Sequence, residues 1–187
     1  MMNSVIDYSS LYNEAYRRGY HKGFSDSRAP RFVRFLLDTA SFDSVLDVGC
    51  ARGWAVKQFL DAGKHAMGVD ASLEPIIDRG ALDLRWGTAT DLPFDDGQFE
   101  AVVSTDMMEH LAPDDVPVAI REFLRVASHC TAHQIATRPA GHPRTREWFD
   151  NINPHLTVRP IDWWVEMFER VGWKLWKRKG NIILLEK

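Results

Sequence analysis

The stretch VLDVGCARG at residues 45–53 decides the fold of this chain. An apolar run ends in the acid Asp47 and then passes through two glycines, Gly49 and Gly53. The residues that follow, 54–60, are apolar at the spacing of a helix. The pattern predicts a strand, a tight loop and a helix, a unit that presents backbone N–H groups to a nucleotide-like ligand. Asp47 at the strand tip is suited to accept hydrogen bonds from a donor-rich group such as an amino-acid ammonium.

Expected strands alternate with expected helices along the rest of the chain. We predict strands at 45–48, 66–70, 82–86, 100–104 and 131–137, helices at 31–39, 54–62, 72–80, 113–126 and 160–172, and a closing hairpin over 173–186. Such alternation predicts an α/β fold with a doubly wound, mostly parallel sheet that helices cover on both faces. The hairpin adds an antiparallel end to this sheet.

The glycine-rich stretch resembles the first motif of the class I S-adenosylmethionine (SAM)-dependent methyltransferases, acid-x-Gly-x-Gly-x-Gly. Here it reads Asp47-x-Gly49-x-Ala51-x-Gly53, and the methyl group of Ala51 restricts positive φ where the family has glycine. A nicotinamide or flavin fingerprint, Gly-x-Gly-x-x-Gly, is disfavoured because positions 51 and 54 hold Ala and Trp. The resemblance extends over about residues 31–187. It implies a seven-stranded Rossmann-like sheet, SAM as cofactor and S-adenosylhomocysteine as product.

Acidic and polar residues at the strand ends are the candidate cofactor ligands. Asp70 ends the second expected strand, where an acid beyond a glycine loop can accept both hydroxyls of a ribose; a helix cap is the alternative. Residues 87–94 resemble the family's adenine-binding segment, with Thr88 where an Asp is usual and Asp91 as its substitute; a plain apolar turn is the alternative. The cofactor-binding residues that the resemblance implies are Asp47, Gly49, Cys50, Ala51, Gly53, Asp70, Ala71, Thr88, Ala89, Asp91, Leu92, Ser104 and Tyr20.

Histidines are the candidate catalytic residues. His110 follows the fourth expected strand in a segment similar to the family's Glu-His-Leu, and the ordinary pKa of histidine suits a general base. His21 and His155 are further candidates, and Asp106 is the runner-up. The alternative is that local hydrogen bonds hold His110 beneath the cofactor. A base is needed only where the acceptor is a hydroxyl or a protonated amine.

Residues 1–30 form an expected aromatic lid that precedes the domain of residues 31–187. An aromatic residue recurs every fourth position, at Tyr8, Tyr12, Tyr16, Tyr20 and Phe24, which gives one stripe on a helix. Tyr12, Tyr16 and Tyr20 could present their faces to the sulfonium cation of SAM. The alternative is a helix whose stripe is buried on the sheet.

The segment 138–159 is basic and aromatic in an otherwise acidic chain, and in this family the exit of the fifth strand faces the methyl acceptor. It predicts a pocket for an anionic or sugar-like small molecule, with arginine as a bidentate clamp. A solvated loop anchored by its tryptophan is the alternative. The residues concerned are Arg138, His142, Arg144, Arg146, Trp148, His155 and Arg159.

Composition narrows the function classes. The chain has 187 residues and a formal net charge of -3, which gives no general attraction to nucleic acid or an anionic membrane. No stretch is apolar for long enough to span a bilayer, and no signal-peptide pattern opens the chain, so we expect a cytoplasmic location. Two cysteines, Cys50 and Cys130, predict neither a disulfide framework nor a metal site.

Two rival functions stay open. A nucleic-acid methyltransferase needs a basic face, which only residues 138–159 offer. A SAM-binding module without catalysis is the other, because Ala51 and Thr88 depart from the family pattern. With no large insertion after the fifth strand, the acceptor site is either open or completed by a partner subunit.

Overall fold

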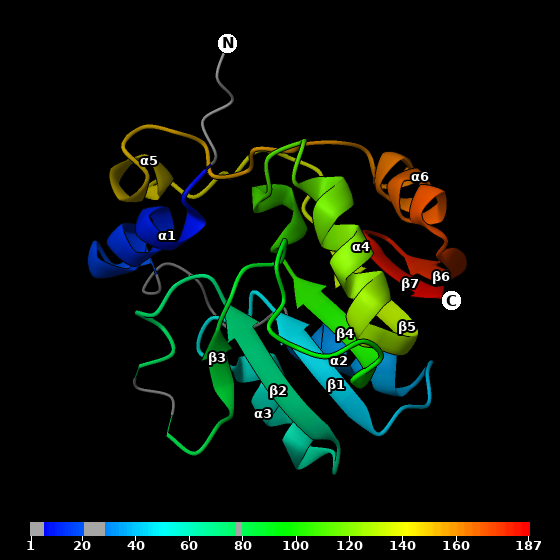
Figure 1. The fold of residues 1–187 in the computed structure, drawn as a ribbon. Coiled ribbons are helices and arrows are strands. Elements are labelled where there is room, and N and C mark those ends of the chain that lie inside the picture. Colours follow the sequence, from blue (N-terminus) through cyan, green and yellow to red (C-terminus); the bar gives the residue numbers. More distant parts are fainter. Residues whose placement is uncertain (1–5, 21–28, 78–79) are drawn as a thin grey trace.

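A computed structural model describes residues 6–20, 29–77 and 80–187, without the side chains of residues 29 and 146. Seven strands form one sheet in the order β3-β2-β1-β4-β5-β7-β6 (Figure 1). The strands are β1 (Ser44–Val48), β2 (His65–Asp70), β3 (Leu84–Trp86), β4 (Phe99–Thr105), β5 (Ala127–Gln134), β6 (Lys174–Lys179) and β7 (Ile182–Glu186). Strands β1 to β5 pair in parallel, and β7 is antiparallel to both β5 and β6. This confirms the predicted doubly wound sheet with an antiparallel end.

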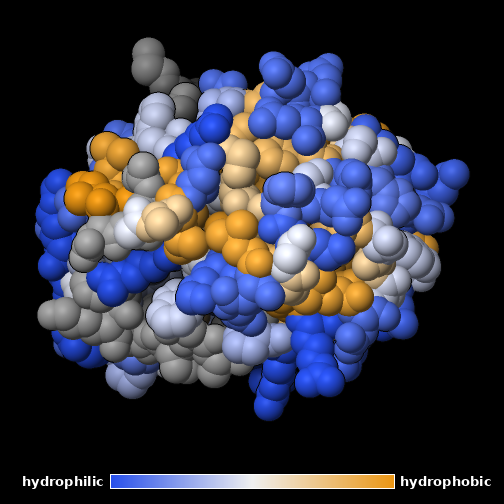
Figure 2. Space-filling view, turned by 90° about the horizontal axis from the view of Figure 1, so that it is seen from below, coloured by the Kyte–Doolittle hydropathy of each residue, from blue (hydrophilic) through white to orange (hydrophobic). Residues whose placement is uncertain are grey.

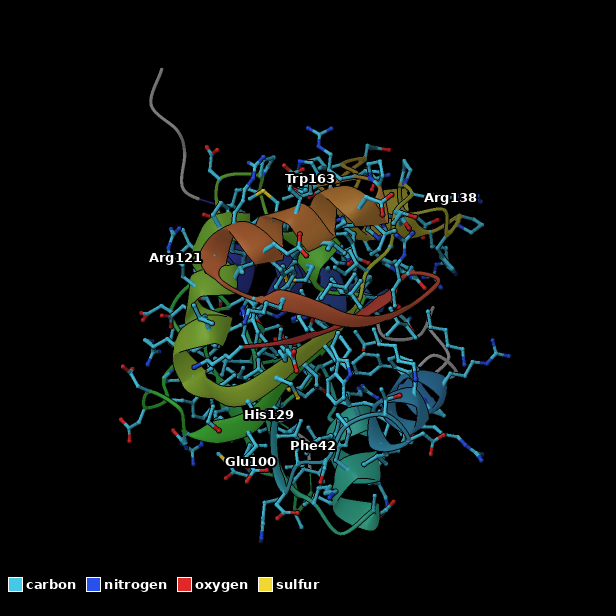
Figure 3. All side chains as sticks on the ribbon, turned by 90° about the vertical axis from the view of Figure 1, so that its right-hand side faces the viewer. Phe42, Glu100, Arg121, His129, Arg138 and Trp163 are labelled. Carbon is cyan, nitrogen blue, oxygen red and sulfur yellow. The ribbon has the colours of Figure 1, made fainter. Side chains whose placement is uncertain are left out.

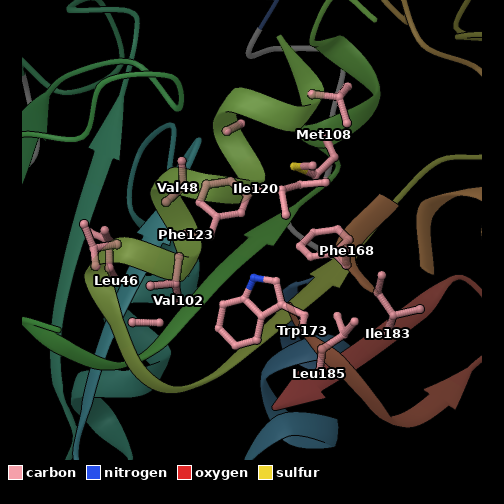
Figure 4. Packing of buried hydrophobic residues seen from close by; sticks show 14 of the residues in the cluster. Leu46, Val48, Val102, Met108, Ile120, Phe123, Phe168, Trp173, Ile183 and Leu185 are labelled. Carbon is pink, nitrogen blue, oxygen red and sulfur yellow. The ribbon is translucent and has the colours of Figure 1, made fainter. Parts of the chain in front are cut away.

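Helices cover both faces of the sheet. Helices α4 (Val116–Val126) and α6 (Ile161–Val171) pack on one face, and α2 (Ala29–Leu37) and α3 (Trp54–Asp61) pack on the other (Figure 1). The apolar run of β7 serves both layers, because Ile183 and Leu185 join the first core while Ile182 and Leu184 join the second. Figure 4 shows Phe168 of α6 and Trp173 packed with residues of β7 in the first core. Strands buried on both faces are typical of a parallel sheet.

A separate small layer lies beyond the carboxyl ends of the strands. Helix α1 (Tyr8–Arg17) lies beside the short helix α5 (Thr145–Trp148) above the arrowheads of β1, β2 and β4 in Figure 1. Ala15 of α1 forms a buried cluster with Trp148 and Phe149, not with the sheet. Of the aromatic stripe, Tyr12 and Tyr20 pack against this small cluster, whereas Tyr8 packs against the first core.

Three expected elements differ from the structure. Residues 72–77 form turns where a helix was predicted, and the backbone N–H groups of Leu73 and Glu74 donate to Oδ1 of Asn13 instead of supporting a helix. Strand β5 occupies 127–134 and not 131–137, because it begins directly where α4 ends. Helix α4 begins at Val116, three residues after the expected start.

Within the described ranges, no helix is both long enough and apolar enough to cross a bilayer. On the face shown in Figure 2, apolar residues form an interrupted strip across the middle, and hydrophilic residues border it.

Candidate cofactor and acceptor site

The glycine loop between β1 and α3 is held in a left-handed conformation. Gly49, Ala51 and Gly53 have φ values of 76°, 47° and 76°. A Cβ at Gly49 would lie 2.4 Å from Cγ of Met107, so this position also lacks room for a side chain. The loop therefore requires two glycines for conformation, and Ala51 adopts the strained conformation that the sequence motif assigns to glycine.

Asp70 fixes this loop to the end of β2. Its carboxylate accepts hydrogen bonds from the backbone N–H of Ala51 and of Ser72, both at 2.8 Å. Burial raises the pKa of Asp70 to about 6, although these two hydrogen bonds act in the opposite direction. A carboxylate has about four acceptor positions. Asp70 thus retains acceptor capacity for ligand hydroxyls after binding both N–H groups.

Asp47 is a buried carboxyl group that lines the same cleft. Its residue is 4% exposed, and within the described part of the chain no group donates a hydrogen bond to its side chain. Burial is the main cause that raises the pKa of Asp47 to about 7, and the negative charge of the nearby Asp70 contributes to the same shift. A buried carboxyl group without a donor is costly for the protein alone. A cationic ligand group with several N–H donors would satisfy it.

One large cleft runs along the carboxyl ends of the strands. It brings together most of the predicted site residues, which come from six separate segments. Those that line it are Asp47, Gly49, Cys50, Ala51, Asp70, Ala71, Thr88, Ala89, Tyr20, His110 and His155. The residues predicted to bind cofactor that do not line it are Gly53, Asp91, Leu92 and Ser104. His21 lies outside the described residues.

The four residues that do not line the cleft lie in the sheet, in the core, at the surface or in the tightly packed loop. Ser104 is fully buried in β4, and its Oγ lies 2.8 Å from Nδ1 of His133 in the sheet. The side chain of Leu92 is buried in the core, whereas Asp91 is exposed. A Cβ at Gly53 would meet Leu82 at 2.8 Å, so this glycine allows close packing of the loop. Of the candidates predicted in the segment 87–94, Thr88 and Ala89 are those that line the cleft.

His110 is held by hydrogen bonds on both sides of its ring. Nδ1 of His110 lies 2.5 Å from the Tyr12 hydroxyl, and the ring also bonds to the backbone of Pro154. Burial, and next the nearby His155, lower the pKa of His110 to about 3. A neutral His110 therefore accepts a hydrogen bond from Tyr12 at Nδ1.

His155 faces the cleft beside His110. Their ring centroids are 4.8 Å apart, and Nδ1 of His155 lies 2.7 Å from the carbonyl oxygen of Arg138. A carbonyl only accepts, so Nδ1 carries the proton and the lone pair of the neutral ring lies on Nε2. With Glu109, the two histidines bring metal-ligand atoms within 4.8 Å of one another. The hydrogen bonds of His110 to Tyr12 and of His155 to Arg138 occupy one nitrogen of each ring.

Only part of the basic segment 138–159 reaches the cleft. Arg138, His142 and His155 line it. Arg144 lies over the Trp148 ring and pairs with Glu147, and Arg159 lies over the Trp163 ring. Of the basic residues in this segment, Arg138, His142 and His155 thus lie in the cleft, whereas Trp148 and Trp163 contact Arg144 and Arg159.

Sequence reasoning missed how α1 is fixed across the cleft. Oδ1 of Asn13 accepts hydrogen bonds from Ser72 Oγ, Leu73 N and Glu74 N at 2.7, 2.9 and 3.3 Å. At the start of the helix, the Tyr8 hydroxyl donates to Asp115 at 2.5 Å and accepts from Ala112 N at 2.8 Å. The aromatic period identified the helix, but no pattern in the sequence indicated these distant partners.

Comparison with known proteins agrees with this geometry. The family model described as a methyltransferase domain matches residues 46–129. Residues 46–129, a little under half of the chain, are therefore similar to a methyltransferase domain. A malonyl-[acyl-carrier protein] O-methyltransferase of Erwinia billingiae is 32% identical over 88 residues, which are 45% of this chain and 34% of that protein. The match thus spans about a third of the curated relative.

Solved structures share the fold of this chain. A chain of the complex between the Haloferax volcanii Trm112 methyltransferase activator and the putative methyltransferase superposes with a TM-score of 0.70 and 21% identity, over 93% of this chain and 80% of that one. The 1,6-didemethyltoxoflavin-N1-methyltransferase of Burkholderia thailandensis, with bound S-adenosylhomocysteine, superposes with a TM-score of 0.70 and 15% identity. The match covers 100% of this chain and 93% of that one. S-adenosylhomocysteine is what remains of SAM after methyl transfer, so that neighbour binds the product of this cofactor. Among the described residues no group donates a hydrogen bond to Asp47, and this carboxyl group and the left-handed glycine loop fit a ligand of that kind.

Proposed function

We propose that this protein transfers a methyl group from SAM to an oxygen or nitrogen atom of a small-molecule acceptor. The observation that carries the proposal is the buried carboxyl group of Asp47, which lines the cleft beside Asp70 and meets no donor within the described chain. The amino-acid ammonium of SAM supplies a positive charge and several N–H donors to such a group. Bound there, SAM supplies a methyl group on a sulfonium sulfur.

Three segments would hold the cofactor. Asp47 and Gly49 take its amino-acid part, and Asp70 with Ala71 takes the ribose hydroxyls. Thr88 and Ala89 lie at the adenine end, where the threonine hydroxyl accepts from an amino group without charge assistance. This assignment is supported by the single cleft that these residues line.

In this proposal the N-terminal segment 1–30 serves as a lid, and helix α1 is part of it. Tyr12, Tyr16 and Tyr20 line the cleft. The rings of Tyr12 and Tyr16 contact the ring of Tyr20 edge to face, with centroid distances of 6.1 and 5.4 Å. An aromatic face stabilises a desolvated cation by up to about 2 kcal/mol. These rings are the aromatic groups suited to the sulfonium.

The acceptor proton, where there is one, passes to His155. Nε2 of this histidine carries a lone pair because Nδ1 donates to Arg138. As the acceptor atom forms its bond to the methyl carbon, the carbon–sulfur bond breaks and its electrons stay on sulfur. Most of the acceleration comes from positioning, which contributes about 7–11 kcal/mol in favourable intramolecular cases. Tyr12 and His110 position the wall of the acceptor site.

Small acceptors are supported by two similar proteins. One relative is named for O-methylation of a malonyl group on a carrier protein, and one structural neighbour for N1-methylation of 1,6-didemethyltoxoflavin. Both names describe a small reacting group, and they differ in the atom that is methylated. We therefore propose a small reacting group and leave oxygen and nitrogen as alternatives that an acceptor panel separates.

Calorimetry of cofactor binding tests the first half of the proposal. We expect binding of SAM and S-adenosylhomocysteine at micromolar concentration and no binding of NAD. Asp70→Ala should weaken SAM binding by about tenfold or more because the ribose loses a charged acceptor. Asp83→Ala, an exposed acid outside the cleft, is the matched control. Absence of SAM binding to the unaltered protein would refute the function.

Product formation tests the second half. Release of S-adenosylhomocysteine is measured with panels of carboxylic acids, N-heterocycles, carbohydrates, RNA and DNA. Turnover of one class of small acceptor, lowered about 10²- to 10⁴-fold by His155→Ala with unchanged cofactor affinity, supports the proposal. Tight SAM binding without turnover of any acceptor would instead identify a binding module.

A further inference from the structure

Five of the cations that line the cleft come from three segments outside the glycine loop. We call Arg31, Arg34, Arg138, Lys177 and Lys179 the basic rim. They come from α2, from the loop after β5 and from β6. Lys179 lies over the ring of Phe35 at 5.9 Å, which joins β6 to α2. Figure 3 shows Arg138 on the same side of the molecule as the turn between β6 and β7.

The charges of the basic rim are mostly uncompensated. Of its members, only Arg34 has an ion pair within the described ranges, with Asp38 at 3.7 Å. Elsewhere the cations are commonly paired, as Lys57 is with Asp61 and Arg125 with Glu122. Within the described residues, this chain of net charge -3 thus brings four cations without an ion pair to one cleft. Like charges so arranged repel one another and favour an anionic ligand.

We propose that the basic rim binds the phosphate groups of a phosphate-ester acceptor. This inference rests on the proposed methyltransferase function and names the chemical class of its substrate. A single carboxylate is satisfied by one arginine fork, whereas the rim offers cations on three separate segments. A phosphate or diphosphate carries more charge and more acceptor oxygens, so it can contact several of these segments together.

The rim is directly connected to the reacting end of the site. The carbonyl oxygen of Arg138 accepts the hydrogen bond from Nδ1 of His155, while the same residue's side chain belongs to the rim. Phosphate bound at the rim therefore places the rest of the ester beside His155. The acceptor is held by its phosphate and reacts at its other end.

A different role for the lysines of β6 is protection of an edge strand, which lysine commonly provides. All six residues of β6 are exposed, and the strand is last in the sheet. Lys174 belongs to the same exposed strand but does not line the cleft. Lys174 therefore distinguishes edge protection from phosphate binding, because a lysine that protects the edge strand does not have to line the cleft.

The test is calorimetric titration of inorganic pyrophosphate into the full chain saturated with S-adenosylhomocysteine, with malonate at equal ionic strength as comparison. We expect pyrophosphate to bind at least about tenfold more tightly than malonate. The Lys177→Gln/Lys179→Gln variant and the Arg138→Gln variant should each lower that affinity about tenfold, with unchanged affinity for S-adenosylhomocysteine. Lys174→Gln should bind like the unaltered protein.

Three results would overturn the inference. These are no pyrophosphate binding, equal binding of malonate, or equal loss in Lys174→Gln, which would make the effect one of general charge. None of them affects the cofactor titration, so the methyltransferase proposal can stand while this inference fails. If S-adenosylhomocysteine does not bind, pyrophosphate is titrated into the chain alone, and loss of its binding in the rim variants still supports a phosphate site.

Discussion

The hydroxyl of Tyr12 lies 2.5 Å from Nδ1 of His110, which joins the first helix to the end of the fourth strand across 98 residues of sequence. His110 is buried and its pKa is lowered to about 3, so the ring is neutral and accepts this hydrogen bond. The pair fixes the N-terminal helix over the cleft.

Tyr12→Phe should destabilise the protein by about 1–3 kcal/mol, because a buried ring nitrogen loses its donor. The measurement is urea unfolding at pH 7.5. Equal stability of Tyr12→Phe and the unaltered protein would show that the pair contributes nothing to docking of α1.

Asn13→Ala should release α1 from the loop after β2, because Oδ1 of Asn13 accepts three hydrogen bonds there. We expect faster amide hydrogen exchange over residues 8–17 and faster dissociation of SAM. Asn13→Asp keeps an acceptor oxygen and is the matched control. Identical exchange in Asn13→Ala and Asn13→Asp would refute the assignment of this side chain as the contact that holds the helix.

Asp47 should make cofactor affinity depend on pH. Its pKa in the free protein is raised to about 7, and an ammonium group binds the ionised form. Affinity for SAM should therefore rise between pH 5.5 and 7, and binding should release a proton, which calorimetry in buffers of different ionisation enthalpy detects. In Asp47→Asn, SAM should bind more weakly and the part of this pH dependence due to Asp47 should be lost.

The same residue should lower stability at high pH. The folded pKa of Asp47 lies above the unfolded value, so the native state binds the proton more strongly and stability falls as pH rises from about 4 to about 7. Asp47→Asn should thus stabilise the free protein at pH 8 by a few kcal/mol, roughly 2–4. Thermal unfolding at pH 5 and pH 8 measures this, and an equal effect at both values would contradict it.

Ala51→Gly should stabilise the free protein by about 0.5–1 kcal/mol, because Ala51 has a φ of 47° that glycine adopts without strain. The gain is limited because glycine also increases the entropy of the unfolded chain. Ala55→Gly in helix α3 is the control and should destabilise by about 1 kcal/mol. Urea unfolding compares the two variants. Destabilisation by Ala51→Gly would refute the inference that the backbone of Ala51 is strained.

Local sequence determined the sheet, the glycine loop and the segments at the strand ends. Apolar runs such as 45–48 and 182–185 predict buried strands by themselves, and the order of strands and helices then leaves few topologies. Asp47 and Asp70 could be placed in one site because the carboxyl ends of neighbouring parallel strands share an edge. The acid-glycine motif supplied the class of ligand for the same local reason.

Only the tertiary structure decided which side chains face the cleft and which partners they have. Ser104 lies at a strand end, yet it bonds to His133 inside the sheet, because the face on which a residue lies depends on pairing with β5. The contact of Tyr12 with His110 and the gathering of Arg31 with Lys177 join residues 98 and 146 positions apart. Such distant contacts arise from packing of the whole chain, and no local pattern of apolar or charged residues encodes them.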